Sequence, residues 1–265
     1  MKTTKSVVTI PGHEADWRYA KVARISGDQE VFGTPVKDGT LLWQTSVTED
    51  EFHGLVSFPT PSPAALALNI AMRTARAANE ARGKVSYSGG MGDHPKSLEK
   101  QSISMLFAYF EQCMVSAVFS FQCLEAYANQ VISHVLKDPV DLPRRKGTIR
   151  LTPDEIELRA STEEKLAVVL PKVLGVPSPK GTKVWAGYKE LKGVRDSTVH
   201  LKSGDHYVRG RQDRESLYYR FLNTSPLYFP RTAVRTVRHF CSANPERWLL
   251  LAEPLLAEEG KGTGT

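Results

Sequence analysis

Residues 98–136 read LEKQSISMLFAYFEQCMVSAVFSFQCLEAYANQVISHVL and contain neither proline nor glycine. Both residues interrupt helices, so their absence over this length predicts one long helix, or two helices in line. Roughly 40 residues at about 1.5 Å each would make it about 60 Å long. The segment is apolar nearly all round, which is typical of the central helix of a bundle. The stretch therefore predicts a mainly α-helical fold.

Residues 103–136 of this segment are the strongest candidate for a membrane span, and their polar residues argue against one. They are Glu111, Gln112, Gln122, Glu125, Asn129 and His134. A spanning helix needs about 20 predominantly apolar residues, so we expect a soluble protein. Residues 1–10 hold too short an apolar run for a signal peptide. Cys113 and Cys123 lie in the apolar segment and are expected to be buried, reduced thiols, which favours the cytoplasm.

Residues 1–95 are predicted to form a small β-containing region. Strand-like runs separated by turn residues occur at 6–10, 19–25, 41–47 and 55–58. Ser62 is a candidate cap for a helix that starts at Pro63 and runs to about Arg82. The Gly-rich stretch at 87–93 lacks the Lys and Ser/Thr of a phosphate-binding P-loop, so we interpret it as a flexible linker.

Residues 96–258 are predicted to form a helical domain, followed by a disordered tail at 259–265. After the long helix we expect a basic loop over 137–150. Helix starts follow at Thr152–Glu155 and at Ser161–Glu164, the second helix ending near Gly175. Further helices are expected at 182–203, 214–223, 231–242 and 245–257.

The segment 185–202, WAGYKELKGVRDSTVHLK, places Arg195, Asp196 and His200 in the order Arg, polar residue, three residues, His. Here the chain resembles the HEPN superfamily, whose helical-bundle members carry that motif. Residues 119–129 also resemble the family's long early helix, which has a Glu and an Asn within an apolar run, here Glu125 and Asn129. The resemblance covers about residues 97–242. It implies a HEPN-like bundle, and many HEPN proteins are metal-independent endoribonucleases that work as homodimers, with a toxin or defence role.

These residue types suit RNA cleavage by the RNA's own 2′-hydroxyl. His200 can act as acid or base near neutral pH, and Arg195 offers a permanently charged fork for phosphate. Asp196 precedes His200 by four residues, so on a helix its carboxylate could hold the imidazole. One chain supplies one such His whereas the reaction needs an acid and a base, so a homodimer is expected. Arg195 falls within an apolar helical arc and is predicted to point towards Glu125 and Asn129, or into a dimer cleft.

The chain carries 35 Lys and Arg against 29 Asp and Glu, a net charge of +6, which permits a polyanionic partner. Candidate RNA-binding cations follow the motif or recur along one helix face: Lys202, Arg209, Arg211, Arg231, Arg235 and Arg238. No histidine has metal-ligand spacing with carboxylates or thiols, so neither a metal nor another cofactor is expected. Some HEPN toxins carry a Tyr two residues after the His, where this chain has Lys202.

Three alternatives stay open. In the first, Arg195, Asp196 and His200 form an ordinary solvated helix face, and Glu125 and Asn129 merely satisfy donors in the core. In the second, the chain is a catalytically silent HEPN-like module that binds a nucleotide, RNA or protein. In the third, it is a purely structural helical protein with an accidental motif. If it is a toxic nuclease, a restraining partner protein is also expected.

Overall fold

The computed structural model describes residues 16–20, 22–31, 34–90, 95–144, 147–201, 216–241 and 245–257. The chain divides into two compact units, one formed by residues 1–66 with 244–265 and the other by residues 67–243. This division differs from the expected boundary near residue 95, because most of the helix after Ser62 belongs with the helical unit. The expected strand at 6–10 and the expected tail at 259–265 lie outside the described residues.

The first unit is built from antiparallel hairpins, as the strand-like runs predict. Its strands are β1 (Val22–Arg24), β2 (Gln29–Val31), β3 (Thr34–Val36), β4 (Leu41–Trp43), β5 (Thr45–Asp50) and β6 (Gly54–Pro59). β1 pairs with β4, β2 with β3, and β5 with β6. Gly27 and Gly39 adopt positive φ angles of 74° and 80° in the connections, where other residues would be strained. The helix α9 (Arg247–Ala257) belongs to this unit, and Arg247 donates a hydrogen bond to the Asp16 carbonyl (3.0 Å).

The helix α1 (Pro63–Gly83) begins where the Ser62–Pro63 signal predicts. Ser62 Oγ accepts a hydrogen bond from the Ala65 amide (3.3 Å), which satisfies one of the free donors of the first turn. Within the second unit, α1 presents small buried residues such as Ala71 and Ala75. Ser116 on the long helix donates to the Ala71 carbonyl (2.9 Å), so these two helices approach closely.

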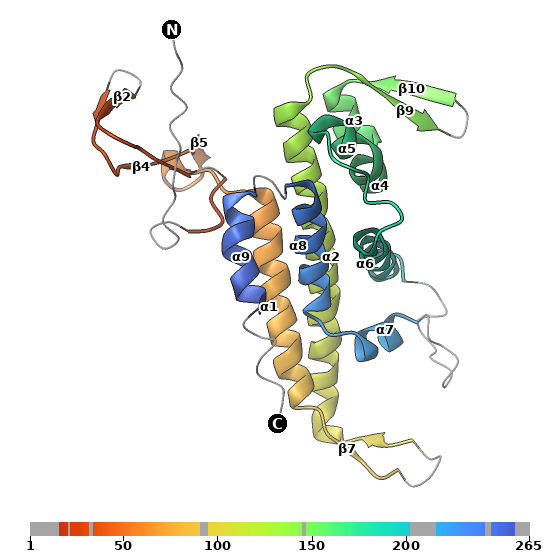
Figure 1. Cartoon of the computed structure of the whole chain (residues 1–265). Coiled ribbons are helices and arrows are strands. Elements are labelled where there is room, and N and C mark those ends of the chain that lie inside the picture. Colours follow the sequence, from red (N-terminus) through yellow and green to blue (C-terminus); the bar gives the residue numbers. More distant parts are fainter. Residues whose placement is uncertain are drawn as a thin grey trace. The chain divides into compact units, whose positions relative to one another are not determined.

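The predicted long helix is α2 (Ile103–Val135), which is central to the second unit (Figure 1). It packs against α3, α5, α6, α7 and α8. Its 33 residues correspond to about 50 Å, shorter than expected because Lys100–Ser102 form a 3₁₀ turn and Leu98 lies in a strand. Cys113 and Cys123 are fully buried free thiols, as predicted, and burial raises the pKa of each to about 12.

Two segments expected to be irregular are hairpins. The strands β7 (Tyr87–Ser88) and β8 (Ser97–Leu98) pair across the Gly-rich stretch, and the expected loop at 137–150 is largely β9 (Val140–Arg144) paired with β10 (Gly147–Leu151). In β9, Val140 and Leu142 are buried while Asp141 is exposed, an alternation that the nearby basic residues and prolines obscure in the sequence.

The remaining predicted helices are present and begin within three residues of their expected starts. They are α3 (Pro153–Arg159), α4 (Thr162–Glu164), α5 (Leu170–Leu174), α6 (Lys183–Val199), α7 (Leu217–Asn223) and α8 (Tyr228–Phe240). Capping boxes at Thr152 and Ser161 start α3 and α4, and Gly175 closes α5 with a left-handed φ of 66°. A π-helical segment, Lys165–Val169, joins α4 to α5. The protein is therefore mainly α, with small antiparallel sheets.

Candidate functional site

The Arg195–His200 segment lies at the C-terminal end of α6, which packs against α2 and α8. The Thr182 hydroxyl caps α6 by accepting a hydrogen bond from the Trp185 amide (3.3 Å). Gly187 allows close approach to α8, because a β-carbon there would lie 3.3 Å from a methyl carbon of Thr232. Gly193 similarly leaves room for Arg220 of α7, whose Nη1 would lie 3.4 Å from a β-carbon at that position. These glycines allow α7 and α8 to pack closely against α6.

The Arg195 guanidinium contacts an aromatic ring of α2. Its guanidinium carbon lies 3.9 Å from the centroid of the Phe121 ring, a cation–π contact, and Phe121 also stacks against the buried Tyr188 of α6. Arg195 Nη1 pairs with Asp196 Oδ1 at 2.9 Å, while its Nε is buried without a hydrogen-bond partner. Arg195 thus points towards the expected helix, but it contacts Phe121, one turn before Glu125.

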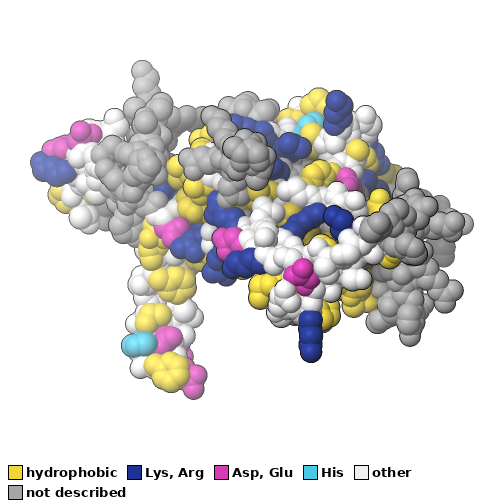
Figure 2. Space-filling model, turned by 90° about the horizontal axis from the view of Figure 1, so that it is seen from below, with side chains coloured by type: hydrophobic (Ala, Val, Ile, Leu, Met, Phe, Trp, Pro, Cys, Tyr) yellow, Lys and Arg dark blue, Asp and Glu magenta, His cyan; other side chains and the backbone are white. Residues whose placement is uncertain are grey.

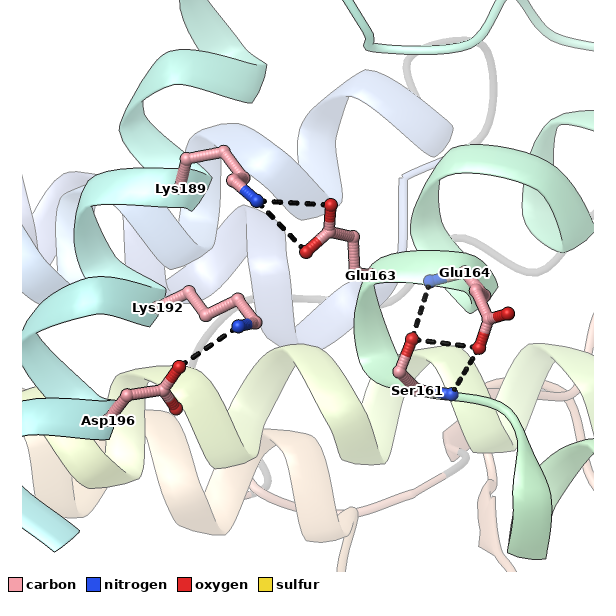
Figure 3. Close-up of polar contacts among 6 residues, drawn as sticks. All are labelled: Ser161, Glu163, Glu164, Lys189, Lys192 and Asp196. Atoms are coloured by element: carbon pink, nitrogen blue, oxygen red, sulfur yellow. Dashed lines mark hydrogen bonds and ion pairs between the residues drawn. The ribbon is translucent and has the colours of Figure 1, made fainter. Parts of the chain in front are cut away.

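Asp196 pairs with two cations. Lys192 Nζ donates to its Oδ2 at 2.9 Å (Figure 3), and Arg195 pairs with its other oxygen. One turn earlier, Lys189 donates to both carboxylate oxygens of Glu163 on α4 (3.0 and 3.1 Å), which ties α6 to the α4 segment. Asp196 therefore balances the local positive charge on α6.

His200 terminates α6 and has an exposed side chain. Its amide donates to the Asp196 carbonyl (2.9 Å), but its φ of −122° and ψ of 67° take the chain out of the helix. The expectation that Asp196 and His200 share a helix face required a helix through residue 200. Within the described residues the imidazole makes no hydrogen bond, so it is not oriented by Asp196 in this single chain.

Glu125 and Asn129 lie beside a cation that the sequence analysis missed. Lys165 is 1% exposed, and its Nζ donates to Asn129 Oδ1 (2.8 Å) and to the Glu157 carbonyl (2.9 Å). Burial lowers the pKa of Lys165, while the nearby Glu125 partly offsets that effect. The burial of Lys165 could have been predicted from helical spacing. Thr162, Lys165, Leu166 and Val169 share one face of the segment, and this face is buried. Asn129 thus satisfies a donor in the core, as one of the open alternatives held.

The candidate RNA-binding cations fall into two groups. Lys202, Arg209 and Arg211 lie outside the described residues. Arg231, Arg235 and Arg238 share α8, and buried residues such as Ala233 and Val237 lie between them in sequence. Arg235 is exposed and the other two are partly buried.

Charge is distributed unequally between the two units. Residues 67–243 carry 27 Lys or Arg and 17 Asp or Glu, a net charge of +10, whereas the first unit carries 8 and 12, a net charge of −4. Figure 2 shows Lys and Arg side chains gathered near the middle of one face, with separate acidic side chains among them. The helical unit is therefore the part of the chain suited to a polyanion.

The described residues contain no group of three or more His, Cys, Asp or Glu side chains that could hold a metal ion. One helical stretch among them, Lys100–Val135, is long and apolar enough by composition to cross a membrane. α2 packs against several helices of its unit, and 28% of the most apolar window of this stretch is buried.

No family model, curated protein or solved structure matches the chain.

Proposed function

We propose that this chain is a HEPN-like, metal-independent endoribonuclease that acts as a homodimer in the cytoplasm, in a toxin or defence role. The observation that carries the proposal is the arrangement of two side chains at the end of α6. There the guanidinium of Arg195, fixed by Phe121, lies five residues before an exposed imidazole that has no hydrogen bond among the described residues. An exposed imidazole can exchange a proton with a substrate near neutral pH, and a guanidinium is permanently charged and suited to phosphate.

The proposed reaction is an internal transesterification of RNA. The 2′-oxygen attacks the adjacent phosphorus while a base takes the hydroxyl proton, and the bond to the 5′-oxygen breaks as an acid supplies a proton. The products are a 2′,3′-cyclic phosphate and a 5′-hydroxyl. His200 from each of two chains would supply the base and the acid, and Arg195 would stabilise the negative charge that develops on phosphate.

The net charge of +10 on residues 67–243 supports an RNA partner, because Lys and Arg contacts to phosphate do not depend on base sequence. The exposed Arg235 on α8 and the cations that follow His200 are the candidates for such contacts. A restraining partner protein is part of the same proposal, since an uncontrolled ribonuclease would damage its own cell.

The decisive experiment measures cleavage of labelled single-stranded RNA by the purified chain in the presence of EDTA. His200→Ala should lower the rate by about a hundredfold or more, the usual contribution of a general acid or base. His134→Ala is the matched control, because His134 is also an exposed histidine of the helical unit but lies on α2. Activity that requires magnesium would contradict the mechanism, and RNA binding without cleavage would favour a catalytically silent RNA-binding module.

The homodimer is tested by light scattering on the same preparation. We expect a dimer, since most soluble oligomers are symmetric and one chain supplies one His200. A stable monomer with full activity would contradict the two-chain site.

A further inference from the structure

The hairpin formed by β5 and β6 has a fixed tip. Its register pairs Thr45 with Pro59 at one end and Asp50 with Gly54 at the other. Asp50 Oδ1 accepts hydrogen bonds from the amides of Phe52 (3.0 Å) and His53 (2.9 Å), and Gly54 supplies a positive φ of 70°. The tip is therefore an organised turn that holds Phe52 in place.

This hairpin exposes large apolar side chains on both of its faces. Phe52 is 84% exposed, Leu55 74% and Val47 62%, and the register puts Leu55 and Val47 on one face with Phe58 on the other. Among the described residues no third strand joins it. A two-stranded hairpin without a covered face is only marginally stable in water, so this apolar surface is suited to a protein contact.

The hairpin is also acidic within a basic protein. Residues 45–59 contain Glu49, Asp50 and Glu51 and no Lys or Arg. Removing these three negative charges from the chain's net charge of +6 leaves +9 on the remainder. RNA or another polyanion would be repelled by this surface, whereas a basic protein surface would be attracted.

We propose that the β5–β6 hairpin docks on the basic helical unit of a second copy of this chain. The chain itself supplies the complementary charge, because residues 67–243 carry a net charge of +10. Two hairpins facing each other would bring like charges together, so the contact joins a hairpin to a different surface. When each copy gives its hairpin to the other, a two-fold axis closes the assembly.

The exchange of two hairpins brings the contact towards the size of a standard dimer interface. A standard interface involves about 20–30 residues on each partner. The hairpin contributes 15 residues per copy, and each copy also supplies the surface that receives its partner's hairpin. The proposal does not depend on ribonuclease activity, since it is argued only from the exposed apolar side chains of the hairpin and from the opposite charges of the hairpin and the helical unit.

The test measures self-association of the full chain by sedimentation velocity over a range of concentrations and salt. Phe52→Ser combined with Leu55→Thr removes the apolar tip while keeping strand propensity and the Asp50 turn. Glu49→Lys combined with Glu51→Lys reverses the charge. Each variant should raise the dissociation constant about tenfold or more, as expected for a truncated interface anchor, and added salt should weaken the wild-type dimer.

Two controls match these changes. Leu250→Ser removes another exposed apolar side chain (47% exposed), on α9 of the first unit, and Glu30→Lys reverses an exposed acid in another hairpin of that unit. Neither should alter association. A monomer at every concentration, a dimer unaffected by both hairpin variants, or a dimer strengthened by salt would overturn the proposal, whether or not the chain cleaves RNA.

Discussion

Two cations contact α2 from neighbouring segments, and they differ in burial and in hydrogen bonding. Lys165 is almost completely buried and donates to Asn129 and to the Glu157 carbonyl. The Arg195 side chain keeps 26% of its surface exposed, rests on the Phe121 ring and leaves Nε without a partner. Lys165 therefore stabilises the attachment of its π-helical segment to α2. Arg195 keeps part of its charged side chain exposed, as a residue that binds an external anion must.

The largest effect expected from this comparison is on stability at Lys165. Lys165→Met keeps most of the volume but leaves the Asn129 oxygen and the Glu157 carbonyl without their donor. We expect the free energy of unfolding to fall by about 2 kcal/mol, the cost of unsatisfied polar groups at a mostly buried site. Arg195→Met, measured by the same urea titration, should cost clearly less. An equal or larger loss at Arg195 would contradict the structural role assigned to Lys165.

The contribution of Lys165 should also depend on pH. Burial holds its pKa below the ordinary value of about 10.4, so the unfolded chain binds more protons than the folded chain between the two pKa values. Stability contributed by Lys165 must therefore rise as pH increases through that window. The measurement is the difference in unfolding free energy between the wild type and Lys165→Met from neutral to alkaline pH. This difference should widen with pH, and a narrowing difference would contradict the assigned direction.

A double-mutant cycle separates the partners of Glu125. The sequence predicted that Glu125 would couple to Arg195, but no ion pair joins them within the described residues, and Glu125 instead acts electrostatically on Lys165. Glu125→Gln should therefore be non-additive with Lys165→Met by about 1 kcal/mol and additive with Arg195→Ala within about 0.5 kcal/mol. Additivity with Lys165→Met and non-additivity with Arg195→Ala would instead support the pairing of Glu125 with Arg195 that the sequence predicted.

Local signals in the sequence predicted much of the helical framework. The uninterrupted apolar run predicted α2, and the helix-start signals at Thr152 and Ser161 predicted where α3 and α4 begin. These features depend on neighbours in sequence, so pattern analysis finds them. The β9–β10 hairpin was missed because Pro143 interrupts the alternation in β9, although the pairing includes strand formers such as Val140 and Ile149.

The site was predicted less completely, because its geometry depends on contacts between helices. The apolar arc of α6 correctly directed Arg195 towards α2. Its ring contact with Phe121 depends on how α2 and α6 are aligned, which the sequence of either helix does not specify. Asp196 and Lys192 lie four residues apart, the same spacing that suggested a pair between Asp196 and His200. Lys192 lies within α6 and forms the pair, whereas His200 ends the helix.

The smallest effect on stability is expected at Asp196. Its pairs with Lys192 and Arg195 are partly exposed, and such pairs contribute about 0.5 kcal/mol or less, so Asp196→Asn should barely change the free energy of unfolding. Its effect on ligand binding should be larger, because the change removes a negative charge that offsets two neighbouring cations. We expect tighter binding of a single-stranded 2′-O-methyl RNA, which lacks the attacking 2′-hydroxyl and is not cleaved, measured by fluorescence anisotropy. Glu111→Gln removes an exposed carboxylate from α2 and is the matched control, expected to shift binding less. Weaker binding in Asp196→Asn would mean that the carboxylate orients a group that contacts RNA, and equal shifts in both variants would mean that only total charge matters.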